Sequence, residues 1–193
     1  MSHRLLNPWA AALLIAPMLA TQPALAAGKA HEHGTLKLDV AIDGAQLSVA
    51  LEVPLDNLLG FERAPRNEAE RKAAGELLAR LRAPGQGPAL FAPDAAAQCT
   101  LARAEVNAPV LVPAGHEPTR PRGATASATG SEHADLDASY TYSCAQPAAL
   151  RKLDIGLFEV FQRLQRIDVQ LAGPQGQAKS TLKRPQRRVQ LAR

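Results

Sequence analysis

The stretch LKLDVAIDGAQLSVALEV, residues 36–53, decides the fold expected for this chain. Apolar residues alternate with polar or small residues on both sides of the dipeptide Asp43-Gly44. This period of two is typical of strands that bury one face, and Asp-Gly favours the tight turn of a β-hairpin. We therefore predict two antiparallel strands joined by a turn at Asp43-Gly44.

The remaining chain predicts one main helix and several further strands. Asn67 can cap a helix that runs to about Arg82, because apolar residues recur at helical spacing up to Pro84-Gly85. A short helical turn is expected at 158–164. Further strands are expected at 99–106, 136–144, 153–157, 167–171, 177–183 and 187–191. The predicted fold class is α+β, an antiparallel sheet or open sandwich of about seven strands.

The first 26 residues have the features of an export signal. Arg4 supplies the positive charge, residues 10–20 are apolar, and Ala24-Leu25-Ala26 is a small-x-small cleavage site. The apolar run is shorter than the ~20 residues that span a membrane, so we expect a cleaved signal peptide rather than an anchor. Residues 27–193 are then expected to form a single domain located outside the cytoplasm.

The two cysteines, Cys99 and Cys144, are expected to form a disulfide, because oxidising compartments favour such bonds. One cysteine begins a predicted strand and the other ends one, which fits an antiparallel pair. The alternative is that two thiolates bind zinc. The residues between these strands, about 107–135, are rich in Pro, Gly, Ser and Thr and are predicted to be a flexible connector.

The formal net charge is +4, and the excess of basic residues lies near the C-terminus. Aromatic residues make up only 4% of the chain, and the chain carries an export signal, so a nucleic-acid partner is not expected. A solvated basic strand face is the main interpretation. Anionic lipid or an acidic partner remains the alternative.

The histidines behind the signal are candidate metal ligands. His31 and His33 would share the polar side of the first strand if that strand extended backwards, and His133 shares a side with Asp135 and Asp137 by the same period. Neutral imidazoles and carboxylates suit zinc, which takes about four ligands. The alternative is a solvated arm and strand end. Cleavage after Gly28 would instead allow an N-terminal Cu(II) site with His31.

No motif indicates catalysis. The sequence lacks Gly-x-Ser-x-Gly, His-Glu-x-x-His and a glycine-rich phosphate loop. A metallohydrolase would also need an acid or base beside its metal in a closed pocket. We therefore expect a protein that is not an enzyme.

Several motifs, in order along nearly the whole mature chain, together resemble the ZrgA family. They are His31-Glu32-His33-Gly34, the hairpin, Leu58-Leu59-Gly60-Phe61-Glu62 with Ala64-Pro65, Phe91 before Cys99, His133 ahead of Tyr140-x-Tyr142-x-Cys144, and Leu157-Phe158 with Arg166-Ile167-Asp168-Val169. This family consists of exported proteins of Gram-negative bacteria, otherwise catalogued as a domain of unknown function.

The resemblance implies zinc binding through histidines and association with an ABC-type zinc uptake system in the periplasm. It implies zinc at His31, His33 and His133, with His116 in the connector that is histidine-rich in some relatives. The family often has a histidine where this chain has Arg63, which would remove a ligand and add a repelling charge.

The function expected from the sequence is that of a periplasmic accessory protein that captures zinc and delivers it to the uptake system. Zinc is not required for folding in this interpretation. The alternative is a disulfide-linked envelope domain that binds a protein partner and has no functional metal.

Overall fold

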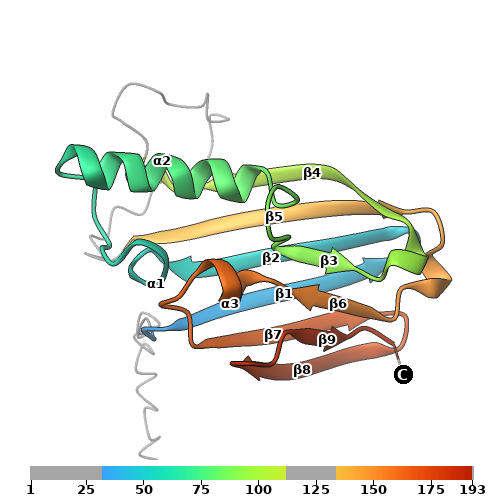
Figure 1. Cartoon of the computed structure of the whole chain (residues 1–193). Coiled ribbons are helices and arrows are strands. Elements are labelled where there is room, and N and C mark those ends of the chain that lie inside the picture. The colour runs from blue at the N-terminus through green and yellow to red at the C-terminus, as the bar shows by residue number, and fades with distance from the viewer. Residues whose placement is uncertain (1–31, 112–133, 193) are drawn as a thin grey trace, which may run out of the picture. The chain divides into compact units, whose positions relative to one another are not determined.

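The computed structural model describes residues 32–111 and 134–192 (Figure 1). The predicted signal peptide, the cleavage site, His31, His116 and His133 lie outside the described residues. Of the predicted connector at about 107–135, residues 107–111 and 134–135 are described, and its two end residues, Asn107 and Asp135, belong to strands. Pro109–Leu111 forms a short 3-10 turn, and Ala108 and Leu111 are buried.

The larger of two sheets has six strands in the order β4-β5-β2-β1-β7-β8. The predicted hairpin forms its centre, with Asp43 opposite Gln46 across the turn. Strand β1 pairs with β7 in parallel, whereas the other neighbours in this sheet are antiparallel. The strands are β1 (Thr35–Asp43), β2 (Gln46–Pro54), β4 (Cys99–Asn107), β5 (Asp135–Cys144), β7 (Arg166–Gly173) and β8 (Gly176–Lys183).

The smaller sheet and the helices lie over one face of the larger sheet (Figure 1). The smaller sheet has three antiparallel strands in the order β3-β6-β9. Its strands are β3 (Phe91–Pro93), β6 (Lys152–Ile155) and β9 (Arg188–Gln190). The helices are α1 (Asp56–Leu59), α2 (Glu68–Arg82) and α3 (Leu157–Val160).

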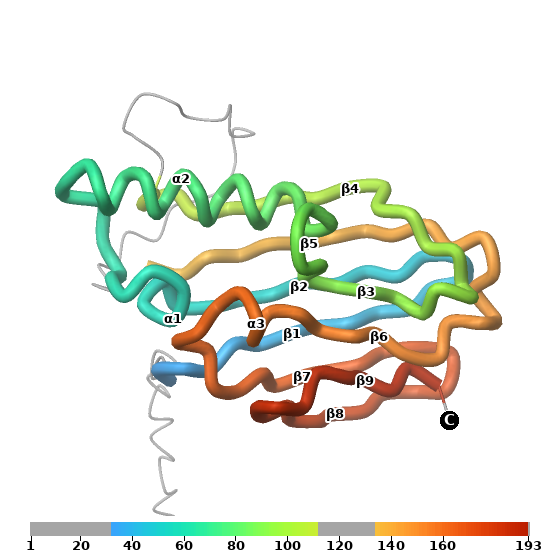
Figure 2. The backbone as a smooth tube through the Cα atoms, viewed as in Figure 1, coloured from blue at the N-terminus to red at the C-terminus, as the bar shows by residue number. Residues whose placement is uncertain are grey.

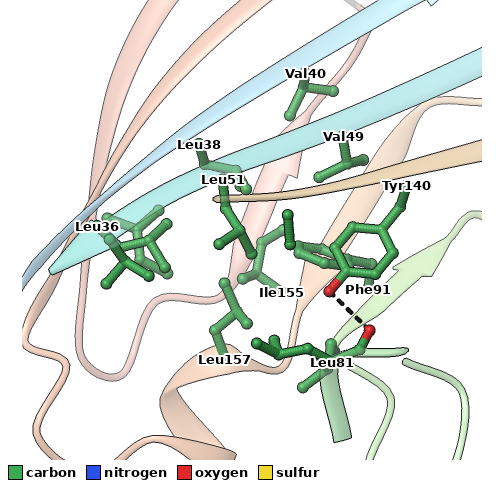
Figure 3. Packing of buried hydrophobic residues seen from close by; sticks show 14 of the residues in the cluster. Leu36, Leu38, Val40, Val49, Leu51, Leu81, Phe91, Tyr140, Ile155 and Leu157 are labelled. Carbon is green, nitrogen blue, oxygen red and sulfur yellow. Dashed lines mark hydrogen bonds between the residues drawn. The ribbon is translucent and has the colours of Figure 1, made fainter. Parts of the chain in front are cut away.

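The core lies between the larger sheet and this covering layer (Figure 3). Tyr140 on β5 connects the larger sheet to the covering layer. The Tyr140 ring packs on the Phe91 ring of β3, with centroids 5.1 Å apart. The Tyr140 hydroxyl donates to the carbonyl oxygen of Leu81 on α2 at 3.0 Å. Burial raises the pKa of this hydroxyl well above its usual value. Alternate residues of β1, such as Leu36 and Leu38, point into the same core, while Lys37 lies on the open face.

The structure confirms the α+β class, the hairpin, the main helix and the disulfide. The Asn67 side chain accepts a hydrogen bond from the Glu70 N–H at 2.8 Å, which caps α2. Cys99 lies opposite Cys144 on neighbouring strands, and the two are bonded.

The strands differ from the prediction in number and in one boundary. The described residues contain nine strands rather than about seven. β3 was missed because three residues show no periodicity. The prediction that Leu157 continues a strand is wrong, because β6 ends at Ile155 and Leu157 begins α3.

Candidate functional site

Residues 31–34, called the arm below, directly precede β1. The described part of the arm, residues 32–34, leads into β1 through a turn. The Thr35 N–H donates to the carbonyl oxygen of Glu32 at 3.1 Å, and Gly34 has a φ of +77°. Residues with a side chain rarely adopt this φ, so glycine suits the position. The predicted backward extension of the first strand is wrong for His33, since β1 begins at Thr35 after this turn.

Asn57 on α1 fixes this turn in place. Its side-chain oxygen accepts from the Gly34 N–H at 2.6 Å, and its amide nitrogen donates to the Thr35 carbonyl oxygen at 2.7 Å. Asn57 is 1% exposed and, apart from the tyrosines of the core, is the one buried polar side chain within residues 32–111 and 134–192. A buried amide with both groups bonded holds its partners in one geometry.

His33 and Asp56 form the centre of the candidate site. The His33 Nδ1 lies 3.2 Å from Asp56 Oδ2, and the two side chains are 72% and 22% exposed. Arg163 contacts the same carboxylate, with Nη2 at 3.2 and 3.3 Å from its two oxygens and Nε donating to the Asp56 carbonyl oxygen. A carboxylate that accepts from Nδ1–H directs the lone pair of Nε2 outward, where it can bind a metal.

A second ion-paired group ties the arm to the sheet. Arg166 on β7 pairs with Glu32 at 3.2 Å and with Asp168 at 2.9 Å. Burial opposes ionisation of Asp168, but hydrogen bonds from Thr181 and Arg166 outweigh it and hold its pKa below the usual value. Through Arg166, the motif Arg166-Ile167-Asp168-Val169 thus holds Glu32 of the arm against β7.

The acidic start of β5 lies at the same end of the sheet as the arm. Asp135 is opposite Pro54 at the end of β2, and the Leu55 N–H donates to the Ala134 carbonyl oxygen at 3.0 Å. Since β1 is the other neighbour of β2, the starts of β1 and β5 are two strand spacings apart, about 10 Å.

Asp137 lies farther along β5, on the open face, opposite Glu52. Partial burial and the charge of Glu52 raise the pKa of its carboxyl group. Asp135 and Asp137 are therefore on one strand, as predicted, but only Asp135 lies at the strand end nearest the arm.

The part of the chain that the structure describes holds no complete metal site. Within it, no three or more His, Cys, Asp or Glu side chains are grouped so as to hold a metal ion. His33 and Asp56 fit the orientation that zinc ligands show, and the other predicted histidines lie outside the described residues. Both cysteines are engaged in the disulfide, so the zinc-thiolate alternative is wrong.

Arg63 forms a local ion pair with Glu70. Its guanidinium makes two hydrogen bonds to the Glu70 carboxylate, at 2.7 and 2.9 Å, and lies over the Phe61 ring at 5.1 Å. Hydrogen bonds from Arg63 and Arg66 lower the pKa of Glu70 to about 2. The charge expected to repel a cation is therefore balanced by Glu70.

Sequence reasoning missed Asp56, Asn57 and Arg163. The first two directly precede the motif Leu58-Leu59-Gly60-Phe61-Glu62, so a polar pair at the head of a recognised motif was the available signal. The sequence carried no signal for Arg163, because 107 positions separate it from Asp56.

Among the described residues, no helix is long and apolar enough to cross a membrane. Comparison with curated proteins found no match. The family model for the ZrgA family zinc uptake protein matches residues 30–191, from just before the arm to the end of β9. This match covers the arm, the hairpin, both cysteines and the Arg166 motif, and the chain belongs to the ZrgA family.

Proposed function

We propose that this protein captures zinc in the periplasm and delivers it to an ABC-type uptake system, with zinc as its cargo. The proposed ligands are His31, His33, His133 and His116, with Asp135 and Asp137 as acidic neighbours. The family description, a zinc uptake protein, supports the zinc role.

The observation that carries this proposal is the shared position of the arm and the start of β5. His31 is two residues before His33, and His133 is two residues before Asp135. Two residues of chain reach at most about 7 Å. Because β1 and β5 are separated only by β2 and begin at the same end of the sheet, histidines distant in sequence have starting points close enough to share one ion.

In this proposal Asp56 orients His33 and does not itself bind zinc. Arg163 already balances the Asp56 charge, which weakens its attraction for a cation but leaves it able to accept from His33 Nδ1. Arg163 holds the Asp56 carboxylate in position through a hydrogen bond, and Asn57 holds the arm in position through its hydrogen bond with Gly34.

Export to the periplasm is the second part of the proposal. The disulfide between β4 and β5 supports it, because such bonds persist mainly in oxidising compartments. The predicted signal at residues 1–26 supports it independently.

Calorimetric zinc titration of the purified protein tests the site. The His31→Ala/His33→Ala and His133→Ala variants should each lower affinity by about tenfold or more, and Asp56→Asn by about tenfold. Asp39→Asn is the matched control. Asp39 accepts a hydrogen bond from Gln170 on the open face, so this variant should leave zinc affinity unchanged. Unaltered affinity in the His31/His33 variant would overturn the site.

Histidine must be neutral to bind zinc, so affinity should fall as pH drops through about 6.5. Release at that pH by the wild type, measured by dialysis and metal analysis, would agree with imidazole ligands. Retention of zinc at pH 5 would contradict them.

A further inference from the structure

The C-terminal strands present a groove that the zinc proposal does not use. It measures about 750 Å³ and is lined mainly by residues of β8, of β9 and of the segment between them, with further residues from the end of β7, from the β7–β8 turn and from directly after β9. Strand β8 is the edge of the larger sheet and β9 is an edge of the smaller one, and both lie on the same side of the molecule (Figure 2). Seven of the eight residues of β8 are exposed, the exception being Leu182.

The hydrogen-bond pattern shows which residues of β8 face outward. The Arg166 N–H donates to Gly34 on the β1 side, so Arg166 does not exchange hydrogen bonds with its partner Lys183. Lys183 instead uses its N–H and carbonyl oxygen outward, to Gln186. By alternation, the N–H and carbonyl groups of Lys179 and Thr181 also point to the outer edge.

Strand β9 has an open edge by the same reasoning. The Arg187 carbonyl oxygen accepts from Ile155, and the Leu191 N–H donates to Arg151, both on the β6 side. The intervening residues Arg188 and Gln190 therefore direct their backbone groups to the other edge. Within the described residues, the groove is thus bordered by two strand edges without a neighbouring strand.

The side chains beside β8 specify the charge of an occupant. Lys179 and Lys183 lie on the face of Thr181, and the ion pairs of the described residues involve neither lysine. The chain has six basic and no acidic residues after Asp168. The lining residues include the arginines Arg187 and Arg188 but no acid, and these arginines pair with Glu159 and Asp154 outside the groove.

The opposite face of an added strand would meet apolar surface. Leu182, Val189 and Leu191 line the groove. A strand added to β8 alternates its side chains as β8 does, so one set lies beside the lysines and the other beside these apolar residues.

We propose that the β8 edge binds an extended segment of a partner protein, with acidic residues alternating with apolar ones, as an added β-strand. The chain's own segments outside the described residues do not match this charge. Residues 1–31 contain Arg4 and Lys29 and no acid, and residues 112–133 contain two acids and two arginines. A strand edge favours a polypeptide over a lipid surface, because lipid offers no ladder of backbone groups.

The probe is a fluorescein-labelled ten-residue peptide that alternates glutamate with valine, titrated into the purified protein with EDTA present. Binding should shift the amide NMR signals of Lys179 and Thr181, and Lys179→Glu/Lys183→Glu should weaken it by about tenfold. A peptide N-methylated at the residues that face β8 should not bind, because it lacks the N–H groups of one edge.

The matched control is Arg71→Glu/Lys72→Glu, which makes the same charge change on α2 and should bind as the wild type does. If Lys179→Glu/Lys183→Glu does not fold, Lys179→Gln/Lys183→Gln replaces it. The glutamine variant should weaken peptide binding by a smaller factor than the tenfold expected of the glutamate variant. The proposal is overturned by absence of peptide binding, by equal binding of the charge-reversed variant, by equal loss in the control, or by signal shifts confined to other strands. Binding of phosphatidylglycerol vesicles without the peptide would also overturn it.

Discussion

Asn57 and Gly34 are joined by a 2.6 Å hydrogen bond from the Gly34 N–H to the Asn57 side-chain oxygen, 23 positions apart in the chain. The same Asn57 side chain donates to Thr35. One buried amide thus determines where the arm leaves β1 and where His33 meets Asp56.

Replacing Asn57 with alanine should lower the free energy of unfolding by about 1–3 kcal/mol, because two backbone groups lose a buried partner. Urea unfolding measures this. Gln46→Ala is the control, since Gln46 is exposed and its side chain hydrogen-bonds only Ser48 in the described residues, and it should change stability by less than about 0.5 kcal/mol. Equal stability of Asn57→Ala and wild type would mean that the arm is held by other contacts.

The Arg63–Glu70 pair predicts that the stability of the folded protein depends on pH in the acid range. The pKa of Glu70 is about 2 in the folded protein and 4.5 ordinarily, so the unfolded chain binds more protons between these values. Stability from this pair is therefore fully present above about 4.5 and is lost as pH falls towards 2.

Arg63→Ala should weaken this dependence, leaving only the smaller part that the hydrogen bond from the Arg66 N–H supplies. Thermal unfolding of the two proteins from pH 2 to 6 should show curves that separate as pH rises from 2 to 4.5 and then stay parallel. The hydrogen bond from Arg188 also lowers the pKa of Asp154, but it is present in both proteins and so does not separate the two curves. Curves that diverge instead above pH 5 would contradict the assignment to Glu70.

Tyr140→Phe should destabilise the protein by about 1–3 kcal/mol, because the buried carbonyl of Leu81 loses its hydroxyl partner. Tyr142→Phe is the control. Burial raises the pKa of Tyr142 to about 12, but none of its described contacts is a hydroxyl hydrogen bond, so its loss should cost little. Urea unfolding compares the two, and a larger effect at Tyr142 would show that α2 is not held by Tyr140.

Gly156→Ala should destabilise the protein by about 3 kcal/mol. A Cβ on Gly156 would collide with the backbone oxygen of Ala89, next to Leu90, whose carbonyl accepts from the Gly156 N–H. Gly75→Ala makes the same change on α2 in open space, and should stabilise by about 0.5–1 kcal/mol through helix propensity. Thermal unfolding of both variants gives the comparison, and equal melting temperatures would contradict it.

Much of the secondary structure was predictable because its signals are local. Alternation along residues 36–53 marks β1 and β2, and Asp43-Gly44 marks their turn. Asn67 marks the start of α2 through its hydrogen bond to Glu70. These patterns reflect backbone geometry that neighbouring residues impose on one another.

The candidate site was predictable only in part. The sequence pointed to His33 and Asp135, but not to Asp56 or Arg163, which meet His33 through folding alone. The turn at Gly34 also removed His33 from the strand on which alternation placed it.

The sequence by itself determined most of the strands, the main helix and the pairing of the cysteines, and it named a few histidines as candidate zinc ligands. Only the tertiary structure decided that β1 pairs in parallel with β7, that the arm and the start of β5 share one end of the sheet, and that β8 has an open edge. Periodicity records which face of a segment is buried, whereas the choice of neighbour depends on contacts between residues far apart in the chain.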